Sequence, residues 1–407
     1  MSLPIQNPSA VRTKIKETSP MTQEITAQHL DDKIILTFLA PFSFDELNTS
    51  QPVPIPPHSF PDEAWQMVSA GEYDDFTKGS AVFDSSKPAS LAWKVAGKES
   101  IHQEIVALLS DKADAYFGAA VKLKVLDWHL VGMNSNIIIS SCMLELDCRW
   151  DIFLRAFPAI RDPFCTDLRD ILVEHLKLLQ PSQTQLAFPY FHVLISGQLK
   201  SEIDRAQLDN SFRPILYPET NAPIESMSPH PQEFIFLGYA FSLILCPDSA
   251  LQRTAQVLPL IEYTSGLYRE LAMASDFAQQ KIIGRQFKKD TEIHDVKNDI
   301  SIMYHEFVSP TFTYTHEMLV LRDGLLATWR VSQLLSRANF LMTQLDLQIK
   351  EWHKEREKKW AKRINTFLFV ITVSTLISVI YDATMMARAF DFLKTTAIEA
   401  WENLFVK

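Results

Sequence analysis

The feature that most constrains this chain is an uncharged, apolar segment near its C-terminal end. Ile364–Tyr381 is 18 residues long and contains no charged side chain. At about 1.5 Å rise per residue, a helix of this length nearly crosses the hydrocarbon core of a bilayer, which is about 30 Å thick. We therefore expect residues 364–382 to span a membrane as one α-helix.

A basic cluster precedes the span and indicates its direction. It has six basic residues against two acidic ones, Glu355 and Glu357. Such an excess of Lys and Arg is typical of the cytoplasmic side of a span. We therefore expect an inner (cytoplasmic) membrane location, with the bulk of the chain in the cytosol and the tail on the far side or in the interface. The cluster consists of Lys354, Arg356, Lys358, Lys359, Lys362 and Arg363.

The region before the span is free of helix breakers. No proline follows Pro310, and Gly324 is the only later glycine. Helix interiors exclude both residue types, so the sequence predicts one continuous helix over residues 312–381. Residues 311–363 of it would form a stalk that leads to the membrane.

Apolar residues in this stalk repeat at alternating spacings of four and three. This is the a/d pattern of a heptad repeat. It predicts either a seam through which copies of the chain associate, or packing on helices expected at residues 251–289 and 291–308. The repeat consists of Val331, Leu335, Ala338, Met342, Leu345, Ile349 and Trp352.

Four polar residues share one side of the predicted span. Thr372, Thr375, Ser378 and Asp382 fall within an arc of about 120° at 100° per residue. Hydroxyls in a membrane helix bond back to their own helix, join neighbouring helices, or line a pore when several copies assemble. Asp382 is either a carboxylate at a pore mouth or a solvated helix end.

Residues 28–248 predict an α+β cytosolic domain with a mixed sheet, because runs of strand and helix character alternate there. The runs are strands at 32–42, 191–199 and 234–245, helices at 99–119 and 162–179, and a hairpin of 121–131 with 136–150.

The other regions have distinct characters. Residues 249–310 predict a helical domain in which Pro259 breaks or kinks the first helix. Residues 1–27 are polar and predict a flexible leader, and residues 51–61 hold five prolines and predict a loop. Residues 383–407 form an amphipathic tail, expected to lie in the interface or to pack in an oligomer.

Composition argues against several chemistries. The formal net charge of −10 disfavours direct nucleic-acid binding. Neither a phosphate-binding glycine motif nor HExxH is present, and no cofactor is evident. Arg169 and His175 match the loose Arg-x(4–6)-His pattern of HEPN-type ribonucleases, and the alternative is an exposed helix face. The four cysteines form no CxxC pair, which indicates reduced, partly buried thiols.

The architecture of residues 234–382 resembles the CorA-type divalent-metal channel superfamily. Lys362–Tyr381 is similar to the first span of that family, and Phe234–Leu271 is similar in layout. The resemblance implies a funnel-shaped homo-oligomer, a pentamer, with pore-facing residues on the single span. A divalent cation is implied by the resemblance alone. Divergent members act as membrane effectors of prokaryotic antiviral defence, in which the soluble domain responds to a small nucleotide.

The chain departs from that family at the filter. The family ends its first span with Gly-Met-Asn, whereas Asp382-Ala383-Thr384 follows Tyr381 here. Gly132-Met133-Asn134 lies between two predicted strands, as a hairpin turn would. The family's second span is missing or replaced by the charged tail. Magnesium selectivity is therefore not implied.

Together these features predict a homo-oligomeric membrane channel or pore-forming effector that its cytosolic domain gates. One alternative is a membrane-anchored sensor or interaction protein without conduction. A further alternative is a membrane-tethered HEPN-type ribonuclease.

Overall fold

The computed structural model describes most of the chain between Ala27 and Phe405. The predicted loop at residues 51–61, the leader before Ala27, and Pro310 lie outside the described residues. Two compact units form, residues 1–280 with 298–340 (unit 1) and residues 281–297 with 341–407 (unit 2). The described ranges are 27–44, 65–68, 81–83, 91–117, 121–133, 137–177, 186–187, 191–216, 224–284, 286–287, 289–309 and 312–405.

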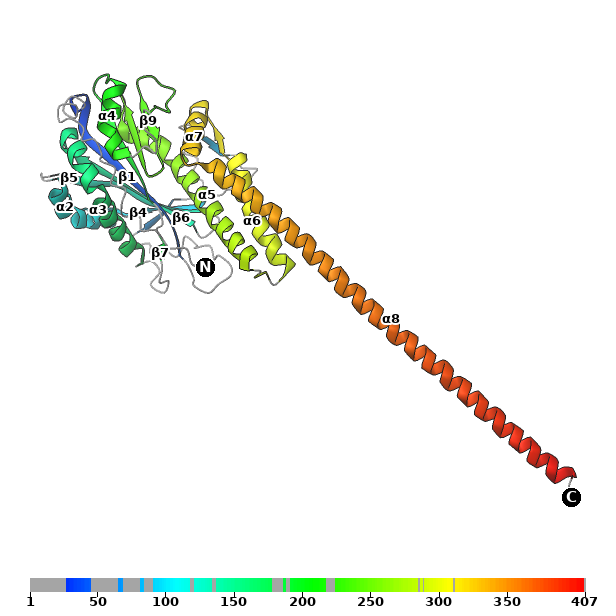
Figure 1. The fold of residues 1–407 in the computed structure, drawn as a ribbon. Helices are drawn as coiled ribbons and strands as arrows, with labels where there is room; N and C mark the ends of the chain where they lie inside the picture. The colour runs from blue at the N-terminus through cyan, green and yellow to red at the C-terminus, as the bar shows by residue number, and fades with distance from the viewer. Residues whose placement is uncertain are drawn as a thin grey trace, which may run out of the picture. The chain divides into compact units, whose positions relative to one another are not determined.

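Unit 1 is built on a mixed sheet with β1 (Leu30–Phe44) near its centre (Figure 1). β1 pairs antiparallel with both β6 (Ile137–Asp147) and β8 (His192–Leu199). Among the described pairs, β8 and β10 (Phe241–Cys246) run parallel. The order along the sheet is β2-β4-β5-β6-β1-β8-β10-β9, and β7 pairs with β1. The remaining strands are β2 (Trp65–Val68), β4 (Leu91–Gly97), β5 (Lys122–Met133), β7 (Leu186–Ala187) and β9 (Phe234–Leu237).

This sheet confirms the predicted α+β class and the hairpin of β5 with β6. The expected strand at 234–245 is instead a tight antiparallel pair, β9 and β10. β1 is buried on both sides, since Leu36 and Phe38 belong to one core cluster whereas Ile35 and Leu39 face the other way. A strand that is apolar on both faces requires a layer of helices on each.

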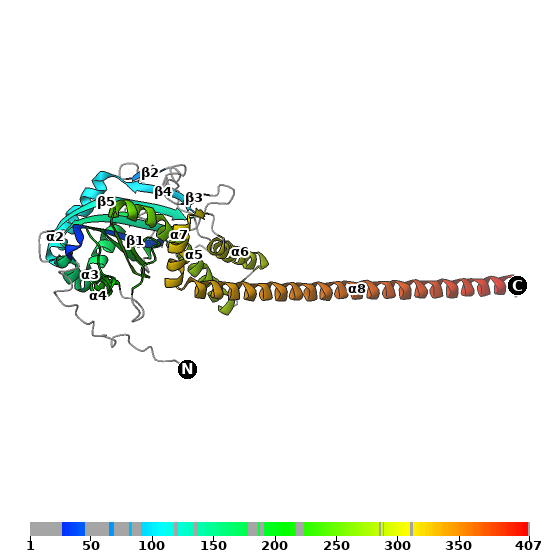
Figure 2. The same ribbon diagram turned by 90° about the horizontal axis from the view of Figure 1, so that it is seen from above.

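Three helices cover the first face of the sheet (Figures 1 and 2). They are α2 (Glu99–Phe117), α3 (Trp150–Lys177) and α4 (Arg205–Leu216). α3 begins 12 residues before the predicted start at residue 162 and continues through Pro158 and Pro163. The rings of Phe153, Phe157 and Phe164 on the same helix are buried and pack on one another, so tertiary packing of α3 overrides the helix-breaking tendency of the two prolines.

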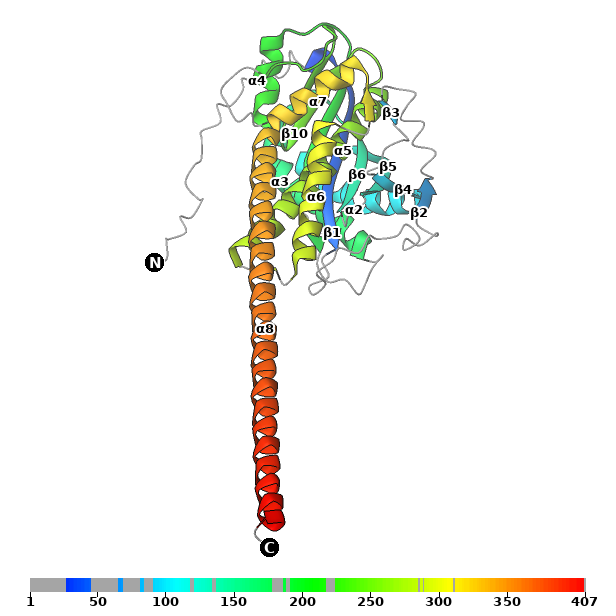
Figure 3. The same cartoon turned by 90° about the vertical axis from the view of Figure 1, so that its right-hand side faces the viewer.

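α5 (Ala250–Gly284) lies against the second face, with α6 (Asp290–Val308) alongside (Figure 3). Thr254 Oγ1 on α5 donates to Ser196 Oγ on β8 at 2.7 Å. Tyr263 Oη donates to Glu306 Oε2 on α6 at 2.6 Å. Pro259 does not break the helix, because α5 continues through it, and the alternative of a kink there stays a prediction. Most of α5 belongs to unit 1, so the compact units differ from the expected boundary at residue 248.

The predicted single helix over residues 312–381 is wrong at both ends. The segment starts with β11 (Phe312–Tyr314), which pairs with β3 (Ala81–Phe83), and α7 (His316–Thr328) follows. Arg330 then adopts φ 54°, and α8 (Val331–Phe405) begins at the next residue. A left-handed residue cannot continue a right-handed helix, so it separates α7 from α8.

Unit 2 contains most of α8 and the facing ends of α5 and α6. Lys297 Nζ on α6 pairs with Asp346 Oδ1 at 2.7 Å, and Arg356 Nη1 pairs with Asp290 Oδ2 at 3.2 Å. α8 does not end at Tyr381, because residues 383–405 continue the same helix. The predicted amphipathic tail is therefore the last part of α8.

Substitution of Gly197 in β8 tests the packing of the unit 1 core. A Cβ at this position would clash with the buried Trp150 ring, whose Nε1 donates to Asp31 O at 2.6 Å. We expect Gly197→Ala to lower the free energy of unfolding by about 2 kcal/mol, as overpacking does. Gly284→Ala is the matched control, because the atoms nearest to its Cβ would be those of the flexible Gln286 side chain. Denaturant unfolding of the full-length variants measures both, and equal stabilities would contradict the packing.

Candidate membrane segment and polar sites

Among the described helices, α8 is the one long and apolar enough to cross a membrane. Its most apolar window has a mean hydropathy of 2.0 and is not buried within the chain. Every residue of Ile364–Tyr381 is exposed. The structure therefore leaves this segment without protein cover among the described residues.

The predicted pore-lining residues are all exposed on α8. Thr372 Oγ1 donates to Leu368 O at 2.8 Å, and Thr375 Oγ1 donates to Ile371 O at 2.9 Å. These bonds use the hydroxyl hydrogens and leave oxygen lone pairs open to an outside donor. Both hydroxyls are thus satisfied by their own helix, and the pore role of Thr372, Thr375, Ser378 and Asp382 stays a prediction.

The heptad residues of α8 line the side of the helix that is covered within the chain. Val331, Ala338, Leu345 and Ile349 are buried, and Leu335, Met342 and Trp352 are partly buried. Leu334 and Leu341 are also buried, which broadens the stripe beyond the strict heptad. Packing within one chain accounts for this periodicity. Association between copies through the same residues stays a prediction.

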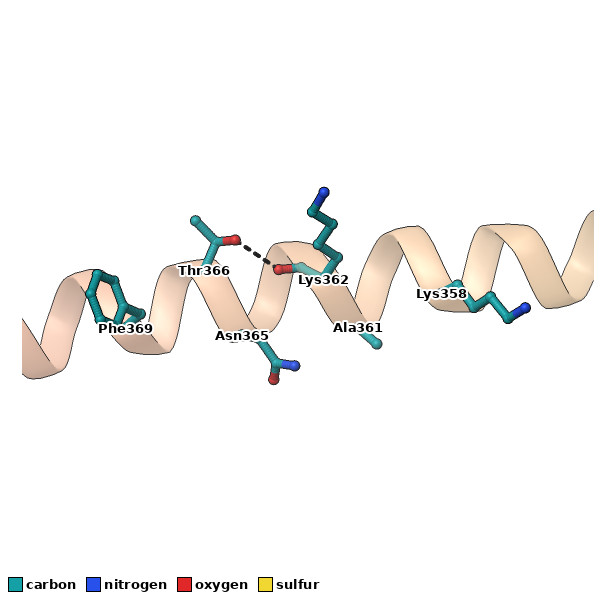
Figure 4. Close-up of a pocket in the computed structure, with 6 residues that line it drawn as sticks. All are labelled: Lys358, Ala361, Lys362, Asn365, Thr366 and Phe369. Atoms are coloured by element: carbon teal, nitrogen blue, oxygen red, sulfur yellow. Dashed lines mark hydrogen bonds between the residues drawn. The ribbon is translucent and has the colours of Figure 1, made fainter.

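The six basic residues before the span are exposed on α8. Lys359 Nζ lies 3.9 Å from Glu355 Oε2, one turn earlier. Lys358 and Lys362 border a shallow surface hollow with Ala361, Asn365 and Thr366 (Figure 4). All the residues that line it come from one exposed helix, so it is a helix surface and not an enclosed ligand site.

Arg169 and His175 do not form a joint site. Six residues on a helix place them about 120° apart. Arg169 pairs with the neighbouring Asp170 at 2.7 Å. His175 is 7% exposed, its Nδ1 donates to Ile171 O at 2.8 Å, and its ring packs edge-to-face on Trp128. His175 is therefore a core residue, and the alternative of an exposed helix face is also wrong for it.

The four cysteines are free and buried. Burial raises the pKa of Cys165 and of Cys246 to about 12, so both stay protonated and unreactive near neutral pH. Within the described residues, no group of three His, Cys, Asp or Glu side chains is placed to hold a metal ion.

A buried polar network joins the sheet to α5. His129 Nε2 lies 2.6 Å from Glu262 Oε1, and His129 Nδ1 lies 2.7 Å from Asp127 Oδ2. Ser141 Oγ donates to the same Glu262 oxygen at 2.5 Å. His129 and Glu262 are each 3% exposed. The network fixes α5 on β5 and β6, and its enclosure gives a substrate no access.

A cavity in unit 1 is lined by aromatic and polar side chains and holds about 30 Å³. Trp329 Nε1 donates to Gly238 O at 2.9 Å, and its ring lies 5.7 Å from that of His192 between centroids. We call this the Trp329 cavity. Its lining includes His192, Tyr239, Ser265, Tyr268, Arg269 and Trp329.

Sequence reasoning did not find the buried network or the Trp329 cavity. His129 and Glu262 are 133 residues apart, and no local spacing relates them. The cavity takes side chains from β1, β8, the β9–β10 turn, α5 and the end of α7. A polar residue within an apolar strand, such as His192 in FHVLIS, was the one local signal.

Comparison with known protein families, with curated proteins and with solved structures finds no match to this chain.

His192 predicts a specific pH dependence of stability. Burial lowers its pKa from 6.5 to about 4, so the unfolded chain takes up this proton at a higher pH than the folded protein does. Stability is therefore lost as pH falls from 6.5 towards 4, by about 2 kcal/mol between pH 7 and 5. We expect His192→Phe to remove this part of the pH dependence in denaturant unfolding, whereas the exposed His230→Gln retains it. An unchanged slope in His192→Phe would contradict the assignment.

Proposed function

We propose that this protein is a membrane channel in which several copies of α8 assemble and conduct cations under the control of unit 1. The observation that carries the proposal is the exposed, uncharged segment Ile364–Tyr381 with its polar residues on one arc. An apolar helix of this length is stable in a bilayer, where its backbone groups are satisfied internally. The basic cluster favours a cytosolic unit 1 and an inner-membrane location.

The polar arc favours assembly over a lone span. Thr372, Thr375 and Ser378 would face lipid in a single helix, whereas a ring of helices turns them towards one another or towards water. The same ring gathers the Asp382 carboxylates at the end of the span. Rings of carboxylates at a pore mouth concentrate cations. The CorA-type resemblance suggests five copies.

A second candidate is a single-helix anchor without conduction. It is favoured by the bonds of Thr372 and Thr375 within their own helix. The burial of Ala338 and Leu345 within one chain also favours it, because those residues then need no second copy.

The orientation is tested by cysteine accessibility in sealed inside-out vesicles, in a background with the four native cysteines replaced by alanine. We expect Glu357→Cys to react with a membrane-impermeant maleimide, because it lies before the span. Glu399→Cys should react only after the vesicles are opened, because it lies beyond the span. Reaction of both in sealed vesicles would show that α8 does not cross.

Conduction is tested with purified protein in planar bilayers. We expect Asp382→Asn to lower cation conductance about threefold at about 0.15 M salt, where the screening length is about 8 Å, because it removes the ring of charge. Asp391→Asn is the matched control, since it removes the same charge from a later turn of α8 and should leave conductance within about 20%.

The two candidates differ in copy number and in current. A channel gives a defined oligomer in native mass measurements and a current that depends on Asp382. A strict monomer without current would support the anchor, and equal effects of Asp382→Asn and Asp391→Asn would contradict the carboxylate ring.

A further inference from the structure

The Trp329 cavity has one buried acceptor without a partner. His192 is 3% exposed, and its Nδ1 lies 3.1 Å from the carbonyl oxygen of Tyr239. Nδ1 must carry the proton to make that bond, so Nε2 is a bare acceptor. Nε2 is buried and has no hydrogen-bond partner among the described residues. Leaving such an atom unpaired is unfavourable, so a ligand with an N–H donor would gain from meeting it.

Three aromatic rings make up much of the remaining wall. The centroids of Tyr239, Tyr268 and Trp329 lie 5.9–6.4 Å apart, and each pair of rings is tilted by 72–86°. Aromatic faces of this kind bind either a planar ring, by stacking or edge contacts, or an organic cation. The geometry of the rings is therefore compatible both with a planar aromatic ligand and with an organic cation.

The charge of the residues that line the cavity distinguishes between these two classes of ligand. Arg269 on α5 lines the same cavity, and its guanidinium is positive at any physiological pH. The burial that holds the pKa of His192 near 4 keeps that ring neutral at physiological pH, so it adds no charge of its own to the cavity. A cationic ligand would meet Arg269 as a like charge, whereas an acidic group would form a charge-assisted hydrogen bond with it.

We propose that the Trp329 cavity binds a small planar heteroaromatic acid, with a ring N–H donated to His192 and the anionic group placed at Arg269. The aromatic walls contact the ring of the ligand. This inference is independent of the proposed channel, because every residue that it uses lies in unit 1.

The cavity must widen to admit such a ligand. About 30 Å³ is room for one or two water molecules. Tyr239 is 38% exposed, whereas Trp329 is 5% exposed. We therefore place the opening at Tyr239, which lies in the short turn between β9 and β10.

The test is calorimetric titration of the full-length protein in nanodiscs, with the heat of empty nanodiscs subtracted. Three probes share one ring and differ in charge: indole-3-acetate, indole and tryptamine. We expect indole-3-acetate to bind about tenfold more tightly than indole, and tryptamine to bind most weakly. Tightest binding of tryptamine would show a cation site, and no binding of any probe at millimolar concentration would overturn the proposal.

Two variants locate the anionic group. Arg269→Met keeps most of the side-chain stem and removes the charge, so it should abolish the preference for indole-3-acetate over indole. Arg337→Met is the matched control, because Arg337 pairs with Asp276 away from the cavity lining. A preference that survives Arg269→Met would overturn the assignment of the acid to this residue.

The N–H contact is tested without altering the protein, so that folding of a variant is not at issue. 1-Methylindole-3-acetate lacks the ring N–H and should bind about tenfold more weakly than indole-3-acetate. His192→Phe should erase that difference, because it removes the acceptor and retains a ring. Equal binding of the two acids to the unaltered protein would contradict the role of His192.

Discussion

The solvent that surrounds Ile364–Tyr381 determines how the rest of α8 can behave. Each exposed Leu, Ile, Val or Phe side chain in water forgoes about 1.5–3 kcal/mol of burial. Phe367, Phe369 and Ile377 are each more than 60% exposed in the single chain. A bilayer relieves this cost without a protein partner, and a helix is the one open-chain structure whose backbone tolerates lipid. The length of α8 and the absence of charge in Ile364–Tyr381 are therefore both explained by the cost of exposing apolar side chains to water.

Unit 1 depends on a different constraint, the burial of β1 on both faces. Leu36 and Phe38 face α2–α4, so the opposite side chains, Ile35 and Leu39, need a second cover. α5 supplies it. The contacts of Glu262 with His129 and Ser141 give this packing a defined register, since sliding α5 by one turn would leave buried polar groups unpaired.

Local pattern predicted much of this architecture. The apolar runs gave β1, β5, β6 and β8 to within a few residues, because strands buried in a sheet have a strong signal. Prediction from the local sequence pattern failed where tertiary contacts override the intrinsic propensity of a residue for helix or strand. α3 continues through Pro158 and Pro163 against a cluster of phenylalanines, and Arg330 breaks the long helix without proline or glycine. The cavity escaped prediction because five separate segments build it.

The break between α7 and α8 at Arg330 is directly connected to the Trp329 cavity, because Trp329 immediately precedes Arg330 in the chain. A non-glycine residue in the left-handed region costs about 1–2 kcal/mol, so other contacts must hold Arg330 there. The Arg330 N–H donates to Ala327 O at 3.1 Å, and its C=O accepts from Gln333 N at 2.9 Å. The neighbouring Trp329 is itself held by its bond to Gly238 O and by the packing of its ring on His192, Tyr239 and Tyr268. The residues that line the cavity thus also fix the turn from which α8 begins. A change in the cavity wall alters the energy of that turn.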